Sequence, residues 1–288
     1  MELNWGKSDV ERKFGFRSKK FTDAGVVFTL IIAFILTLLF YGAIIVVRKD
    51  FPSLEMFFHG GIKMRSRIPY FIVFFSCWSL AIIWVKSMKL SLQEKALKIK
   101  IIPDDPSFIL SPMTVQGILK ELYTHVDNPK HFMLFNRIER ALSNLKNIGR
   151  ISDLTETLSW QAEIDEQFSE STYTLIRGFI WAIPVLGFIG TVLGLSQAVG
   201  GFGTVIAAGA SMNELKESLS GVTGGLAVAF ETTLIALVAA LFIQIILTML
   251  KKREEDFLEQ CSDYCHKNII SKLKTLGIND NNNDHGQD

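Results

Sequence analysis

A single carboxylate stands out in the otherwise uncharged apolar segments of this 288-residue chain. Glu231 is the only ionisable side chain well inside any of four apolar runs, which fall at 24–47, 68–85, 178–213 and 219–250. A charge in the middle of a bilayer is costly, so such a group usually faces protein or water and marks an ion pathway. Counting about 20 residues back from Lys251 instead places Glu231 near the outer boundary of the hydrocarbon. An ion-pathway role and an interfacial or helix-packing role both stay open for Glu231.

The third apolar run carries a narrow face of small side chains. Its members step by four, three and four residues, which places them on one side of a helix: Gly187, Thr191, Gly194 and Ala198. Pro184 precedes this face, and a proline inside a helix removes one backbone hydrogen bond and favours a kink. Because small residues let neighbouring helices approach closely in lipid, the face fits either plain packing or the lining of a channel.

The fourth run has a comparable face of small side chains. Ala229, Ala236 and Ala240 lie on it, together with either Thr232 or Thr233. The helical register leaves the choice between the two threonines open by one residue. Packing and channel lining are again the two alternatives.

The four runs determine the expected fold class. A helix needs about 20 apolar residues, within a range of roughly 17–25, to cross the hydrocarbon, and all four runs meet this requirement. In lipid a helix also pairs every backbone N–H and C=O group without water. We therefore expect an all-α polytopic membrane protein with four transmembrane helices and a helical cytoplasmic domain between the second and third helices.

The distribution of Lys and Arg indicates the orientation, because cytoplasmic loops carry an excess of both. The connection 201–218 has Lys216 as its only positive charge, whereas the segment 86–173 contains many Lys and Arg residues and Lys251, Lys252 and Arg253 follow the fourth run. The basic 48–67 loop leaves the first hairpin ambiguous. We expect both termini and the segment 86–173 to be cytoplasmic.

These observations give a predicted layout for the whole chain. It consists of a cytoplasmic N-terminus (1–23), crossings at 24–47, 68–85, 174–200 and 219–250, extracytoplasmic loops at 48–67 and 201–218, a cytoplasmic helical domain (86–173), a cytoplasmic amphipathic helix (251–276) and a disordered tail (277–288).

The segment 86–173 has the patterns of a folded helical domain. Ser111 and Pro112 predict a helix start, because proline suits the first helical position. Apolar residues repeat at helical spacing between Leu134 and Ile148. A second stretch opens at Ser152 and contains no Pro or Gly before the third crossing, so we expect one continuous helix that projects into the cytoplasm.

A metal site is the less favoured interpretation of the cysteines. Cys261, Cys265 and His266 lie close together on a predicted helix, but two thiols and one imidazole do not complete a zinc set. We favour helix packing for them, and a packed core position for Cys77. The spacing predicts no disulfide framework.

The third and fourth runs resemble a known family. The stretch 184–195 reads PVLGFIGTVLGL and is similar to the Pro-x-x-Gly-x-x-Gly-Thr-Val-x-Gly signature of TolQ and ExbB relatives. The stretch 226–240 resembles the matching fourth-segment motif in its Ala-Phe-(Asp/Glu)-Thr-Thr-Leu form. The resemblance to the MotA/TolQ/ExbB family covers roughly 170–260, while the earlier part agrees only in layout, which is closer to MotA with its four crossings.

This resemblance implies a pore-forming subunit of an ion-driven motor in the bacterial inner membrane. Five copies would enclose a pore that holds a dimer of a single-helix partner like MotB, TolR or ExbD, whose aspartate carries the ion. Thr191 would line the pore with Thr232 or Thr233, of which Thr232 fits the register better. The transported ion would be H⁺, with Na⁺ left open, and no bound cofactor is implied. The candidate ion-pathway residues are thus Pro184, Gly187, Thr191, Gly194, Ala229, Glu231, Thr232 and Thr233.

Two other classes of function compete with this interpretation. A membrane scaffold could act through its cytoplasmic helices without ion flux. An enzyme is disfavoured, because the sequence offers no nucleophile–base pair, metal cluster or phosphate loop. Nucleic-acid binding is disfavoured too, because the Lys and Arg residues mostly flank the apolar runs.

Overall fold

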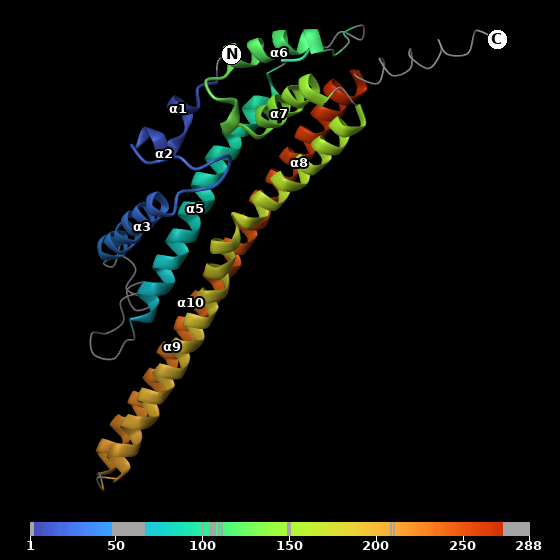
Figure 1. The fold of residues 1–288 in the computed structure, drawn as a ribbon. Helices are drawn as coiled ribbons and strands as arrows, with labels where there is room; N and C mark the ends of the chain where they lie inside the picture. The colour runs from blue at the N-terminus through green and yellow to red at the C-terminus, as the bar shows by residue number, and fades with distance from the viewer. Residues whose placement is uncertain are drawn as a thin grey trace, which may run out of the picture. The chain divides into compact units, whose positions relative to one another are not determined.

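The computed structural model describes residues 3–47, 67–99, 101–103, 108, 110, 112–148, 151–207, 209 and 211–272. These residues are helical apart from turns, connections and one isolated bridge between Leu3 and Val126 (Figure 1). Four of the described helical segments are long and apolar enough to cross a membrane. The predicted all-helical class with four candidate crossings is confirmed.

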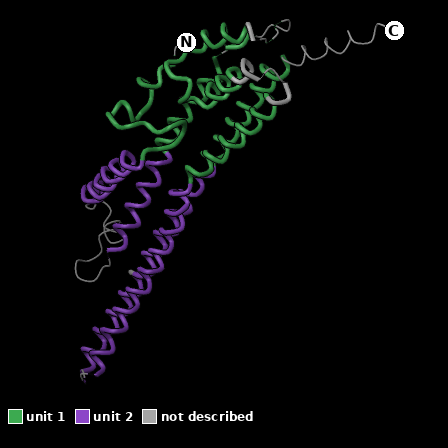
Figure 2. The backbone as a smooth tube through the Cα atoms, in the orientation of Figure 1, with its two compact units in different colours: residues 1–25, 84–173, 249–288 green, residues 26–83, 174–248 purple. Residues whose placement is uncertain are grey.

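The chain divides into two compact units, each made of segments that are distant in the sequence (Figure 2). Unit 2 comprises residues 26–83 and 174–248, and unit 1 comprises residues 1–25, 84–173 and 249–288. Unit 2 contains the apolar parts of the long helices, and unit 1 contains the shorter amphipathic helices.

Unit 2 contains helix α3 (Val26–Val47) and parts of α5 (Ile68–Leu97), α9 (Thr174–Ala207) and α10 (Met212–Cys265). Helix α3 contacts α5 through the indole N–H of Trp78, which donates to Thr29 Oγ1 at 3.2 Å. Helix α5 contacts α9 through the Trp78 and Phe179 rings, whose centroids lie 4.8 Å apart. Helix α9 packs against α10 between Gly187 and Ala198, which lie beside Ala236 and Gly225 (Figure 1).

Unit 1 is built around short amphipathic helices. They are α1 (Trp5–Ser8), α2 (Val10–Lys13), α6 (Pro112–His125), the 3₁₀ turn η1 (Pro129–His131), α7 (Met133–Ile148) and α8 (Ile151–Ser171). The end of α5, the last part of α10 and the π-helical turn η2 (His266–Ile270) complete the unit. The predicted apolar stripe of α7 forms part of its core, since Leu134, Ile138 and Leu142 are fully buried.

The expected continuous helix from 152 into the third crossing is divided in the structure. Helix α8 ends at Ser171 and α9 begins at Thr174, with a two-residue turn between them. The Thr172 hydroxyl donates to the Ser169 carbonyl at 2.6 Å, and the Tyr173 N–H donates to the Glu170 carbonyl at 3.2 Å. Tyr173 is also buried and bonds Glu254, so side-chain contacts that no local pattern encodes stabilise the turn.

Other elements extend beyond their predicted bounds. Helix α6 begins at Pro112 as expected, although Ser111 lies outside the described residues. The predicted connection 201–218 is helical up to Ala207 and again from Met212. Helix α10 continues through the predicted boundary at 250, so the fourth crossing and the predicted helix 251–276 form one element as far as Cys265. Most of the predicted loop 48–67 and the whole predicted tail 277–288 fall outside the described residues.

Candidate functional site

Helices α9 and α10 approach so closely that glycine is required at their contact points. A Cβ atom added to Gly187 would lie 2.6 Å from Ala236 Cβ, and one added to Gly190 would lie 2.7 Å from Thr232 Cγ2. These pairs run in opposite directions along the two helices, so α9 and α10 form an antiparallel hairpin. The two small faces seen in the sequence thus pack against each other within one chain.

Two hydroxyl groups meet inside this contact. Thr191 Oγ1 and Thr233 Oγ1 are hydrogen-bonded to each other, and both side chains are half-buried. Thr233 also donates to the Gly187 carbonyl at 2.9 Å, while Thr191 lies 3.2 Å from the same carbonyl and 3.4 Å from the Ala229 carbonyl. The pair therefore places two hydroxyl oxygens and helix carbonyls together in an apolar setting, where they can donate to or accept from an ion-carrying group.

The structure distinguishes the two neighbouring threonines of α10. Thr233 bonds Thr191, whereas Thr232 is 3% exposed and packs against Gly190. Within the chain Thr191 thus bonds Thr233, while the preference for Thr232 as the pore-lining threonine stays a prediction. Neighbouring side chains on a helix point about 100° apart, so the helical spacing of the small residues could not decide between Thr232 and Thr233.

The other predicted site residues lie on the same two helices. Gly187 and Ala229 are buried in the helix contact, and Gly194 lies beside Ala229. Pro184 is half-buried within α9, and Glu231 is half-buried in α10. The structure brings the small residues together as a packing surface that holds Thr191 and Thr233 in place.

We predict that Gly187→Ala loosens the α9–α10 hairpin. The new methyl group would collide with Ala236, and overpacking of this kind costs about 1–3 kcal/mol. Gly178→Ala is the matched control, because Gly178 lies in the same helix with nothing within 4 Å of the added Cβ. Thermal unfolding of the purified protein should show a lower midpoint for Gly187→Ala and an equal or higher one for Gly178→Ala. Equal midpoints for both variants would contradict the tight contact.

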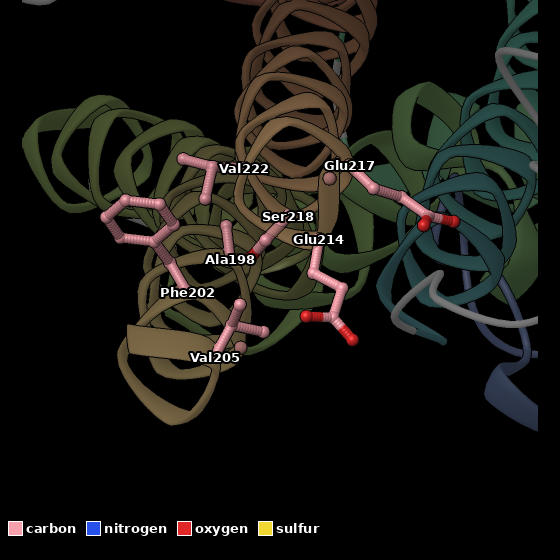
Figure 3. Close-up of a pocket in the computed structure, with 9 residues that line it drawn as sticks. Ala198, Phe202, Val205, Glu214, Glu217, Ser218 and Val222 are labelled. Carbon is pink, nitrogen blue, oxygen red and sulfur yellow. The ribbon is translucent and has the colours of Figure 1, made fainter. Parts of the chain in front are cut away.

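A hollow lies between α9 and α10 at the far end of the hairpin. It has a volume of about 360 Å³, and apolar side chains such as Phe202, Val205 and Val222 line it with Glu214 and Glu217 (Figure 3). Glu214 accepts hydrogen bonds from the backbone N–H and hydroxyl of Ser211, 2.7 and 2.9 Å away, which is a helix-capping arrangement. This acid therefore stabilises the start of α10.

A buried charged cluster in unit 1 was missed by the sequence reasoning. Lys86 and Glu254 are each 1% exposed, and Lys86 Nζ lies 2.9 Å from Glu254 Oε2. The hydroxyls of Thr22 and Tyr173 donate to the Glu254 carboxylate, and Lys86 donates to Thr172 Oγ1 at 2.7 Å. Two charged groups can be buried together when they pair with each other and their remaining hydrogen-bonding sites have partners, as they do here.

One sequence signal could have pointed to Glu254. The apolar stripe of the last helix contains Leu247, Leu250, Leu258 and Cys261, all of which are buried. Continuing this stripe at helical spacing places Glu254 on the same face, where an acid needs a buried partner. The partner itself, Lys86, comes from a distant helix and could not be identified from spacing.

The cysteines of α10 lie on the same buried stripe. Cys261 and Cys265 are buried, free thiols, while Cys77 is half-buried. Among the described residues, no group of three or more His, Cys, Asp or Glu side chains could hold a metal ion. The buried positions of Cys261 and Cys265 agree with the packing role favoured from the sequence.

Comparison with known proteins gives one family. Residues 126–263, just under half of the chain, match the model of the MotA/TolQ/ExbB proton channel family, so the match extends from the end of α6 to α10 and includes the Thr191–Thr233 pair. Comparison with curated proteins and with solved structures gave no match. Over these residues the chain belongs to the MotA/TolQ/ExbB proton channel family, a non-enzymatic family of bacterial inner-membrane, multi-pass proteins that act with a MotB/TolR/ExbD-type partner.

Proposed function

We propose that this chain is the pore-forming subunit of a proton-driven channel or motor. Five copies surround a dimer of a single-helix partner, and an aspartate of the partner carries the ion past Thr191 and Thr233. The alternating charge on this aspartate converts ion flow into rotation or other mechanical work. The observation that carries the proposal is the hydroxyl pair held between α9 and α10 inside the family-matched region.

The energetics support a hydroxyl pair at this place. A charged aspartate in an apolar pore is unfavourable, so its protonation depends strongly on the groups that face it. Hydroxyl groups can hydrogen-bond the neutral acid or help to coordinate a cation. Each elementary charge that crosses the membrane releases about 2.3 kcal/mol per 100 mV, enough to bias one conformational step over its reverse.

The buried cluster of unit 1 supports the proposed topology. Thr22 precedes the predicted first crossing and Lys86 follows the second, while Tyr173 precedes the third and Glu254 follows the fourth. Their side chains meet in one cluster, which supports placing the corresponding ends of all four crossings on the same side. The excess of Lys and Arg there favours the cytoplasm, with both termini on that side.

Purification of the intact complex tests the assembly. We expect the tagged full chain to be isolated from its native membrane as five copies bound to two copies of a small protein, whose single transmembrane helix contains an aspartate. Native mass spectrometry gives this stoichiometry directly. Isolation of the chain alone, or in another copy number and without such a partner, would contradict the proposed motor assembly.

A scaffold without ion flux is the alternative, and it makes opposite predictions. It requires Thr191 and Thr233 to tolerate apolar replacement, while changes on the α7 stripe, such as Ile138→Asp, abolish function. Proton uptake by liposomes that contain the purified complex, driven by a potassium diffusion potential, distinguishes the two functions. Measuring sodium uptake under the same potential in the same liposomes identifies the ion.

A further inference from the structure

The N-terminal loop 12–24 exposes mainly positive charge around an aromatic side chain. Between Arg12 and Ala24 the chain has five basic residues, all exposed, namely Arg12, Lys13, Arg17, Lys19 and Lys20. Phe14 lies among them and is 67% exposed. The one acid of this loop, Asp23, forms an ion pair with Lys19 at 3.0 Å. The exposed surface of the loop 12–24 is therefore cationic, with an apolar ring at its tip.

The acids just before the loop do not reduce this charge at the surface. Asp9 and Glu11 are buried, and both lie near Lys89, at 3.9 and 2.7 Å from its Nζ. Lys89 also donates to the Asp23 carbonyl at 2.7 Å. The negative charges of the segment thus point inward, and the positive charges point outward.

The loop has a fixed shape. Gly15 has φ +77°, which favours glycine, and it ends α2 with two backbone hydrogen bonds, from the Gly15 N–H to the Arg12 carbonyl and from the Phe16 N–H to the Glu11 carbonyl. This is a Schellman cap, which turns the chain sharply after a helix. Phe14 is thereby held at the outside of the turn.

Glu11, just before the loop, hydrogen-bonds one backbone position inside the loop and one directly after it. Its carboxylate accepts from the Lys19 N–H at 3.1 Å and from the Gly25 N–H at 2.5 Å, so these two backbone positions lie a few ångströms apart. Gly25 immediately precedes α3, the first apolar helix. A loop attached this close to the first residue of α3 would lie near the lipid headgroups when α3 spans a membrane.

We propose that the loop 12–24 is a docking surface for the headgroups of anionic phospholipids. Clusters of Lys and Arg beside a transmembrane helix attract anionic lipid, and the attraction fades within a Debye length of about 10 Å. Phe14 supplies the apolar contact that an interfacial segment places among the upper acyl chains. Bound lipid would hold the loop, and through Glu11 and Lys89 the helices α3 and α5, at a defined depth.

Amide hydrogen exchange in nanodiscs tests this proposal on the full chain. We compare nanodiscs of phosphatidylcholine with an equimolar mixture of phosphatidylcholine and phosphatidylglycerol. Amides of residues 12–20 should exchange at least tenfold more slowly in the anionic nanodiscs, since each basic residue near the surface contributes about fivefold to binding and the loop has five of them. The difference should vanish at high salt. Equal exchange in both nanodiscs would overturn the proposal.

Charge-removal variants identify the responsible residues. Arg12→Gln/Lys13→Gln/Arg17→Gln should abolish the lipid-dependent protection, and Phe14→Ser should weaken it. The matched control Lys120→Gln/Lys130→Gln/Lys267→Gln removes three exposed charges elsewhere in unit 1 and should leave the protection unchanged. Inorganic phosphate added to phosphatidylcholine nanodiscs should give no protection; protection by phosphate would show a site for free anions and refute the lipid surface. The comparison of lipids on the unchanged chain decides the matter even if the triple variant misfolds.

Discussion

Thr191→Val is expected to slow proton uptake strongly in liposomes containing the purified complex while leaving membrane insertion intact. Valine keeps the branched shape but removes the hydroxyl that bonds Thr233 in the α9–α10 contact. A hydrogen bond to a charged or ion-carrying group contributes about 1.5–3 kcal/mol, so its loss at the ion's position slows transfer by roughly tenfold to a hundredfold. Thr233→Val should give the same loss, because it removes the other member of the pair.

Matched variants separate this functional effect from a change in folding. Thr191→Ser retains the hydroxyl and should keep most of the flux. Thr248→Val removes a hydroxyl that donates only to the Gln244 carbonyl of its own helix, at 2.9 Å on an exposed face of α10, and should leave the flux unchanged. Full flux from Thr191→Val would favour the scaffold over the motor.

Glu254→Ala is expected to be the most destabilising single substitution outside the apolar segments. It leaves the ammonium group of Lys86 buried without its countercharge, and it removes the acceptor for the Tyr173 and Thr22 hydroxyls. Breaking a buried ion pair on one side costs about 3–5 kcal/mol. Thermal unfolding of the purified protein measures the loss. The exposed pair Lys252–Asp256 serves as control, and Asp256→Ala should cost no more than about 1 kcal/mol.

The double variant Lys86→Met/Glu254→Met tests whether charge itself is needed. Replacement of a complete buried pair by apolar side chains is often neutral or stabilising, so the double variant should recover much of the stability that Glu254→Ala loses. If the double variant is as unstable as the single one, the hydrogen bonds to Tyr173 and Thr172, rather than the ion pair, stabilise the cluster.

The four apolar helices and their order could be predicted from the distribution of uncharged residues. Runs of about 20 uncharged residues have no other stable form in lipid, so hydropathy alone was sufficient to predict them. The same local logic found the amphipathic stripe of α7, the helix start at Pro112 and the glycine and threonine motifs later matched by the family.

Which of these residues contact one another depends on how the helices pack. The partner of Thr191 is Thr233 rather than Thr232, because the close approach of α9 and α10 at Gly187 and Gly190 fixes a rotation that helical spacing leaves open by one residue. Likewise, Lys86 and Glu254 are 168 residues apart, and each resembles an ordinary charge flanking an apolar run. Periodicity reports the face on which a side chain lies, but the choice of its partner depends on long-range packing, which no local pattern contains.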